Sequence, residues 1–294
     1  IDQKFKINTF DKLKFIFSNN NKIQNKIFLT RNKKKYEVYG KNFDASKLLD
    51  QVLNTNNKKQ SSSLFSKLDS TFKIDIDKLY LDKTTYVNDF VGNIKFVDNE
   101  LNSLNLDSSF FNKKKLTLTI KTNDNKEKIT TLFSGYPKPL VKQYKFIKGF
   151  EEGVLDFYSV KKEGITNSVL NIDNFKVQEV PVLAKLLTLA SLQGIADLLT
   201  GEGIRFTNLE VKFSSENDLI KIEEMYAIGP AISILMDGYI EIKKLISLRG
   251  TLVPATTINK TIASIPVIGK ILVGKKTGEG VFGVSFKIKG QPDN

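Results

Sequence analysis

Apolar and polar residues alternate with a period of two over most of this chain. Such alternation places every second side chain on one face of a β-strand. Polar turns such as 123–125 and Asp237-Gly238 separate the runs, which is typical of tight antiparallel connections. The pattern predicts a mainly β protein built on a large antiparallel sheet with one wet and one apolar face. The clearest runs are 72–76, 116–120, 209–213, 220–222, 232–236, 240–242 and 282–288.

Helical periodicity is rare by comparison. Capped or amphipathic patterns predict short helices at 43–53, 139–148 and 257–264, and one apolar helix at 182–199. Pro181 and Gly201 bound the last one, and Lys185 and Asp197 interrupt it, which suits a packed helix better than a membrane span. The segment 54–63 is a low-complexity linker.

The number of strands poses a packing problem. An open sheet of more than about ten strands must curl, split or flatten. A split sheet covers its own apolar face and gives a sandwich, whereas a curled sheet leaves that face open as a binding surface. We expect a strongly curved sheet forming an open groove, with the sandwich as the alternative.

Composition removes several kinds of chemistry. The 294 residues contain no Cys, His or Trp. Disulfides, Ser-His-Asp or Cys-His nucleophiles and ordinary zinc or haem sites are therefore excluded. Carboxylate or lysine chemistry stays open. We expect a protein that is not an enzyme and carries no cofactor or metal.

The net charge is +13, and all of the excess lies in residues 1–150, because residues 151–294 carry one more acidic than basic side chain. All but three of the 45 basic residues are lysine, whereas base recognition favours the bidentate fork of arginine. The charge therefore predicts solvated lysines or a surface for phospholipid headgroups, and no nucleic-acid partner.

Three short motifs come close to catalytic or nucleotide-binding patterns. The segment 269–277 approaches a phosphate-binding loop, but Lys276 stands where the hydroxyl residue belongs. The segment 278–283 fits GxGxxG by letter, but it leads into a strand and not a helix. Asp75 and Asp77 share a strand face with Lys73, so a solvated face is favoured over a hydrolase pair. The hydrolase alternative predicts that the two carboxylates converge in a cleft.

A series of phrases in fixed order carries a resemblance to a known family. They are Asp173–Val177, Pro181–Leu187, Ala190–Leu192, Gly201–Phe206, Ala227–Pro230, Gly250–Pro254, Asn259, Ile265–Gly269, Gly274 and Glu279–Phe282. Together they resemble the AsmA-like C-terminal region of large bacterial envelope proteins. The match covers about 120 residues well and extends more weakly to about Ser70.

The resemblance implies an elongated β-groove, polar outside and apolar inside, that carries phospholipid between the inner and outer membranes. It also implies a periplasmic location, an inner-membrane anchor elsewhere in a longer protein, and no catalytic residues. We therefore expect residues 1–60 to be a fragment of a preceding unit plus linker, and residues 61–294 to be the AsmA-like region.

The alternation selects the side chains that would line such a groove and meet phospholipid acyl chains. The predicted lining residues are Leu209, Val211, Phe213, Ile232, Ile234, Met236, Phe282, Val284 and Phe286. The apolar helix would cap the groove through Leu183, Leu186, Leu187 and Leu189. The alternative function is a structural scaffold of the cell envelope, built as a β-sandwich that binds a protein partner.

Overall fold

The computed structural model describes residues 11–18, 23–46, 69–98, 100–142, 149–178, 181–189, 201–254 and 283–291. These residues form fifteen strands and two short helices, α2 (Lys138–Val141) and α3 (Pro181–Leu189). The strands are β1 (Lys12–Ser18), β2 (Gln24–Asn32), β3 (Lys35–Asp44), β4 (Ser70–Tyr80), β5 (Tyr86–Val97), β6 (Glu100–Phe110), β7 (Lys115–Thr122), β8 (Lys128–Ser134), β9 (Glu151–Lys162), β10 (Ile165–Val177), β11 (Ile204–Glu216), β12 (Leu219–Ile228), β13 (Ile232–Glu241), β14 (Leu245–Pro254) and β15 (Val284–Gly290).

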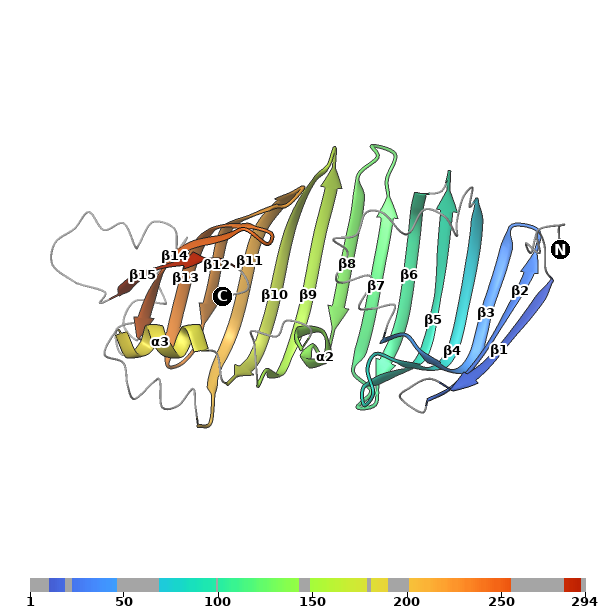
Figure 1. The fold of residues 1–294 in the computed structure, drawn as a ribbon, viewed down its shortest axis with the longest axis horizontal. Helices are drawn as coiled ribbons and strands as arrows, with labels where there is room; N and C mark the ends of the chain where they lie inside the picture. The colour runs from blue at the N-terminus through green and yellow to red at the C-terminus, as the bar shows by residue number, and fades with distance from the viewer. Residues whose placement is uncertain are drawn as a thin grey trace. The chain divides into compact units, whose positions relative to one another are not determined.

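The chain divides into two compact units, Ile1–Pro139 and Leu140–Asn294. The first unit holds β1 to β8 and the second holds β9 to β15. Within each unit the strands pair in chain order, so each described strand lies beside its neighbours in the sequence (Figure 1). The predicted mainly β, mostly antiparallel fold is confirmed. The sandwich alternative requires a second sheet that covers the apolar face. Within each unit the described strands form a single sheet, so the described part of the chain contains no such second layer.

One strand pair departs from the antiparallel prediction. β3 and β4 are parallel, with Val38 opposite Ile74 and Phe43 opposite Leu79. A parallel pair needs a long crossover connection, and the chain from 45 to 69 supplies one. The pair also joins the strands before the predicted linker to those that follow it. The boundary predicted near residue 60 falls outside the described residues and stays a prediction.

The turn predicted at Asp237-Gly238 is wrong. Both residues lie inside β13, and Gly238 faces Leu248 of β14. A Cβ atom on Gly238 would stand 2.2 Å from the carbonyl oxygen of Ser247 and 3.1 Å from the Leu248 side chain. The glycine therefore allows β13 and β14 to approach each other closely. The two predicted runs 232–236 and 240–242 belong to a single strand, which ends at Glu241.

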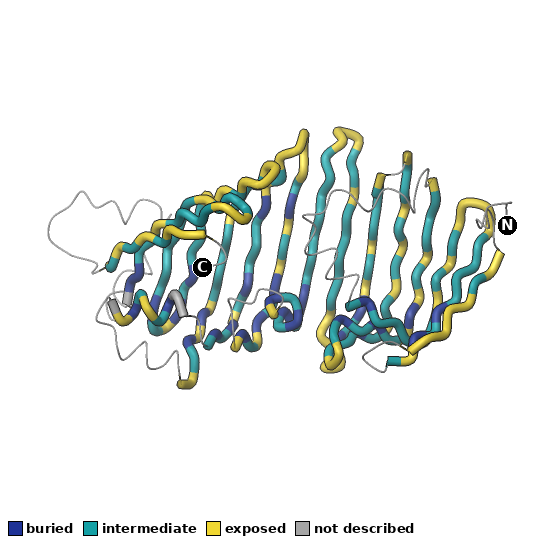
Figure 2. The backbone as a smooth tube through the Cα atoms, viewed as in Figure 1, coloured by how far each residue is buried: buried dark blue, intermediate teal, exposed yellow. Residues whose placement is uncertain are grey.

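The first unit has its own core at one end of its strands. Val87 and Phe110 are 0% and 1% exposed, and Ile76 is 3% exposed. Figure 2 shows buried positions of the first unit gathered near one end of the strands, with half-buried and exposed positions along the remainder. The cluster comprises Ile27, Ala45, Ile76, Leu79, Leu81, Val87 and Phe110.

The two described helices correspond to parts of two predictions. α2 falls at the start of the predicted 139–148 helix, and α3 at the start of the predicted 182–199 helix. Residues 143–148 and 190–199 lie outside the described residues, as do the predicted helix 257–264, the linker 54–63 and the motif 269–277. Of the predicted helix 43–53 only residues 43–46 are described, and Phe43 and Asp44 belong to β3. No helix in the described part of the chain is long and apolar enough to cross a membrane.

Candidate functional site

The registers of β9 to β15 align apolar side chains across the second unit. Residues directly opposite each other in neighbouring strands lie on the same side of a sheet, so the pairings define one face. We call it the apolar face. It consists of Leu155, Phe157, Leu170, Ile172, Leu209, Val211, Phe213, Ile220, Ile222, Met225, Ala227, Ile232, Ile234, Met236, Ile240, Ile246, Leu248, Leu252, Val284, Phe286 and Ile288.

Two rows of this face run across the strands without a charged residue. The first row is Leu155, Ile172, Leu209, Ala227, Ile234, Leu252 and Val284. The second row is Phe157, Leu170, Val211, Met225, Met236, Gly250 and Phe286. The structure thus brings together every predicted lining residue except Phe282, which lies outside the described residues. Their role in holding lipid stays a prediction.

Exposure divides the apolar face along the strands. At one end Ile232 and Leu252 are 0% and 1% exposed, and Ala227 is 4% exposed. Further along the same strands, Val211, Met236 and Phe286 are only half-buried. The face therefore has a closed end with a packed core and an open end that no described segment fully buries.

Helix α3 lies in a connection at the same end of the strands as the closed end. It connects β10 to β11, whose last paired residues there are Val177 and Ile204. The amide of Gln178 donates hydrogen bonds to the carbonyl oxygens of Gly201 and Glu202, which closes the connection.

The predicted capping residues differ in their burial. Leu187 is fully buried and Leu183 is 8% exposed, whereas Leu186 is half-buried. The side chain of Leu189 lies outside the described residues. Lys185 and Thr188 are exposed, so α3 presents one apolar side to the protein and one polar side to solvent.

An aromatic stack at the closed end was not predicted. The ring of Phe175 stacks on Phe150 at 5.5 Å and on Phe206 at 5.3 Å between centroids. Phe175 is buried because the alternation in β10 shifts by one position near Asn174, whose φ is +52°. Period two alone places Phe175 on the opposite face from Ile172, so the sequence pattern gave no sign of the stack.

The first unit also has an aligned apolar face that the sequence analysis did not select as a site. The period-two alternation at 72–76 and 116–120 was the sequence pattern that could have indicated this face. One row across that sheet is Leu13, Leu29, Val38, Ile74, Gly92, Leu106, Leu118 and Leu132.

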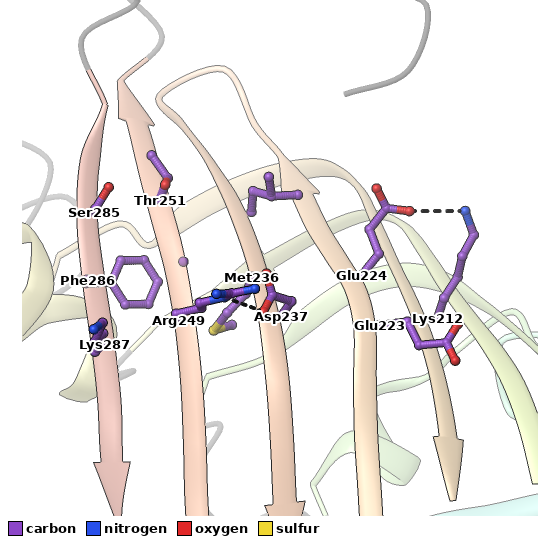
Figure 3. A pocket seen from close by; sticks show the side chains of 12 residues that line it. Lys212, Glu223, Glu224, Met236, Asp237, Arg249, Thr251, Ser285, Phe286 and Lys287 are labelled. Carbon is purple, nitrogen blue, oxygen red and sulfur yellow. Dashed lines mark hydrogen bonds and ion pairs between the residues drawn. The ribbon is translucent and has the colours of Figure 1, made fainter. Parts of the chain in front are cut away.

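Two shallow hollows lie in the second unit, with volumes of about 920 and 1040 Å³. Charged side chains line both, together with residues of the apolar face: Met236 and Phe286 in the first, and Ile222, Leu248 and Ile288 in the second. Figure 3 shows the first one between β11 and β15, with Arg249 bonded to Asp237 at 2.7 Å and Lys212 bonded to Glu224 at 3.3 Å. Alternating cations and carboxylates neutralise one another here, as on a solvated strand face.

A polar cluster beside the first hollow shifts the pKa values of its members. Lys212 bonds to Glu210 at 2.9 Å as well as to Glu224, and these two carboxylates raise the pKa of the lysine. Burial and a hydrogen bond with Glu210 raise the pKa of Tyr226 to about 12. These are the shifts of an exposed ion-pair network, and none of them moves a group toward neutral pH as general acid–base catalysis requires.

The carboxylates that the hydrolase alternative needs do not form a site. Asp75 and Asp77 are both exposed on β4, and neither lines either hollow. Among the described residues, no group of three acidic, His or Cys side chains could hold a metal ion. The structure supports the solvated-face interpretation of this pair.

Comparison of the chain with protein-family models, with curated proteins and with solved structures gave no match. The resemblance to the AsmA-like region therefore stays a prediction, and the geometry of the sheet has to carry the functional argument.

Proposed function

We propose that this chain is a segment of a periplasmic lipid carrier in which phospholipid acyl chains move along a curved, open, apolar sheet. The observation that carries the proposal is the open end of the apolar face, where Val211, Met236 and Phe286 align across strands and remain half-buried. Monomeric soluble proteins seldom expose contiguous apolar patches of more than a few hundred Å² without a binding role.

The energetics of lipid transfer favour such a face. Each CH₂ group removed from water contributes about 0.8 kcal/mol, so a sixteen-carbon tail gains roughly 12 kcal/mol in a fully dry site. An apolar strip holds the tail at any position along its length, because the hydrophobic effect is non-directional. The two rows described above contain no charged residue that would fix a headgroup at one place.

The proposed location and membrane anchor rest on the resemblance to the AsmA-like region, and the lipid partner rests also on the apolar face. A carrier of this kind works in the aqueous space between two membranes, in a longer protein anchored in the inner membrane, and needs neither cofactor nor metal. Its partners are phospholipid and membrane, not nucleic acid.

A pair of neighbouring substitutions tests this proposal. Met236 lies at the open end of the apolar face and Leu235, the preceding residue of β13, lies on the opposite face; both are half-buried. Native mass spectrometry of gently purified protein should find phospholipid bound to the wild type and to Leu235→Asp. Met236→Asp should lose most of that lipid, because a charge in the acyl path must be desolvated when a tail covers it.

Unfolding in urea provides the control for the pair. The two variants should have similar midpoints, since they replace similar residues at similar burial. Equal loss of lipid in both variants, or a wild type that carries no lipid, would contradict the carrier proposal. A lipid-free protein that instead captures a defined protein partner through the apolar face would support the envelope-scaffold alternative.

A further inference from the structure

The first strand of the described sheet ends in three consecutive exposed apolar side chains. β1 is an edge strand, and β2 is its only partner among the described strands. Phe15 is 44% exposed, Ile16 50% and Phe17 48%. Because successive residues point to opposite faces, this edge is apolar on both sides. Natural edge strands normally carry charges or prolines at such positions to prevent unwanted contact.

Three lysines surround one ring beside this edge. The ammonium nitrogens of Lys12 and Lys14 lie 5.9 Å from the centre of the Phe28 ring, and that of Lys26 lies 6.0 Å from it. The three charges are therefore within about 12 Å of one another. None of the three forms an ion pair with a carboxylate in the described part of the chain.

Lysines that form no ion pair with a described carboxylate, next to exposed aromatic and aliphatic side chains, match the surface of an anionic membrane. Lysines there bind lipid phosphates, while apolar side chains enter the boundary between headgroups and acyl chains. Single-stranded nucleic acid also stacks on exposed rings such as those of Phe15 and Phe17, but it is a poorer fit, because the ring that the three lysines surround is not open to a base. The Phe28 ring is half-buried, stacks on Tyr39 at 5.2 Å between centroids and lies beneath the three lysines.

The backbone of β1 limits how deeply this edge can enter. The outer side of an edge strand carries amide and carbonyl groups that make no hydrogen bond within the sheet. Such groups cost several kcal/mol each in hydrocarbon but are satisfied by water and phosphate at headgroup level. The chemistry of the strand therefore suits contact at the headgroup level of a membrane.

We propose that the β1 edge, formed by Lys12, Lys14, Phe15, Ile16, Phe17 and Lys26, docks this protein on the surface of an anionic phospholipid bilayer. This contact does not depend on acyl-chain binding by the apolar face, which lies in the other unit. The two proposals can therefore fail separately.

Co-sedimentation of the full chain with vesicles tests the docking. The protein should bind vesicles that contain phosphatidylglycerol and phosphatidylcholine in equal parts, and binding should weaken as salt increases. Each lysine near an anionic surface contributes about fivefold to the partition coefficient, so Lys12→Glu with Lys14→Glu should reduce it by roughly 25-fold or more. Phe15→Ser with Phe17→Ser should also reduce binding and leave its salt dependence in place.

The opposite edge strand supplies a matched control. Lys287 and Lys289 are exposed lysines of β15, again two residues apart on an edge strand. Lys287→Glu with Lys289→Glu makes the same change in net charge and should reduce binding far less than the β1 pair. Thermal unfolding of every variant shows that each one is folded.

Three results would overturn the docking proposal. The first is equal binding to pure phosphatidylcholine vesicles, and the second is an equal loss in the β1 and β15 pairs. The third is absence of vesicle binding by the wild type. In that case the β1 edge would have another occupant: a second copy of the chain, detected by analytical ultracentrifugation, or single-stranded RNA.

Discussion

Gly250 is a residue whose lack of a side chain decides the packing around it. It faces Phe286 directly across β14 and β15, and the phenylalanine ring lies over it. The same arrangement recurs where Gly40 faces Ile27 and Gly92 faces Leu106. In each pair a large side chain fills the space above a glycine, an established way to stabilise glycine within a strand. A sequence pattern alone suggests a turn or bulge at such positions.

Gly250→Ala should therefore destabilise the second unit. The new Cβ would stand 2.5 Å from the carbonyl oxygen of Leu235 and 2.6 Å from the Phe286 ring, and the backbone oxygen cannot move without disturbing the β13–β14 pairing. We expect a loss of about 1–3 kcal/mol in the free energy of unfolding in urea. Gly290→Ala is the control, because no atom lies within 4 Å of that position. If the two substitutions lower the free energy of unfolding equally, the contact of Gly250 with Phe286 does not contribute to stability.

At the scale of elements, period-two alternation predicted where strands lie but not where their faces shift. Asn174 in β10 and Asp89 in β5 have φ values of +52° and +51° inside strands. In both strands the less exposed positions change phase there, from buried Ile172 to buried Phe175 and from buried Val87 to half-buried Phe90. Asn and Asp tolerate this left-handed conformation better than most residues, but they also occur throughout ordinary turns. The shift is therefore visible only in three dimensions.

Helix α3 provides a test at this scale. Leu187→Ala removes a fully buried side chain from the closed end and should cost about 2–5 kcal/mol of stability. Lys185→Ala, an exposed position of the same helix, should change stability by less than about 0.5 kcal/mol. Urea unfolding followed by circular dichroism measures both. A small effect of Leu187→Ala would mean that α3 is not part of the closed end.

At the scale of the whole molecule, each unit has its own buried apolar residues. Val87 and Phe110 are buried in the first, and Ile232 and Leu252 in the second. Since the chain contains no tryptophan, single substitutions can report on each unit separately. Tyr39 and Tyr239 suit this purpose because they are 36% and 37% exposed, one in each unit.

Tyr39→Trp and Tyr239→Trp should report urea transitions with different midpoints, because separate cores need not unfold together. Tryptophan fluorescence gives each midpoint, and circular dichroism of both variants should show the same overall curve. Coincident fluorescence transitions in the two variants would show that the two units unfold as one.

The sequence was sufficient to predict the general fold and the residues of one apolar face. It predicted a mainly β, mostly antiparallel protein, and alternation placed Leu209, Ile234 and Val284 on a common side. The parallel β3–β4 pair could not be predicted, since alternation is the same in parallel and antiparallel strands. The division of the apolar face into a closed and an open end also could not be predicted, because it depends on Phe175, α3 and the register of seven strands together.

Pairing between strands that follow one another in the chain has a consequence for synthesis. Each new hairpin can join the sheet as soon as it leaves the ribosome, since its partner strand has already emerged, and such short-range contacts form quickly. The parallel pair is the exception, because β4 has to wait for a connection of more than twenty residues to close. The closed-end residues Ile232 and Leu252 emerge only after α3, so apolar side chains of the growing sheet stay exposed until β14 is complete, and a holding chaperone would bind them during that interval.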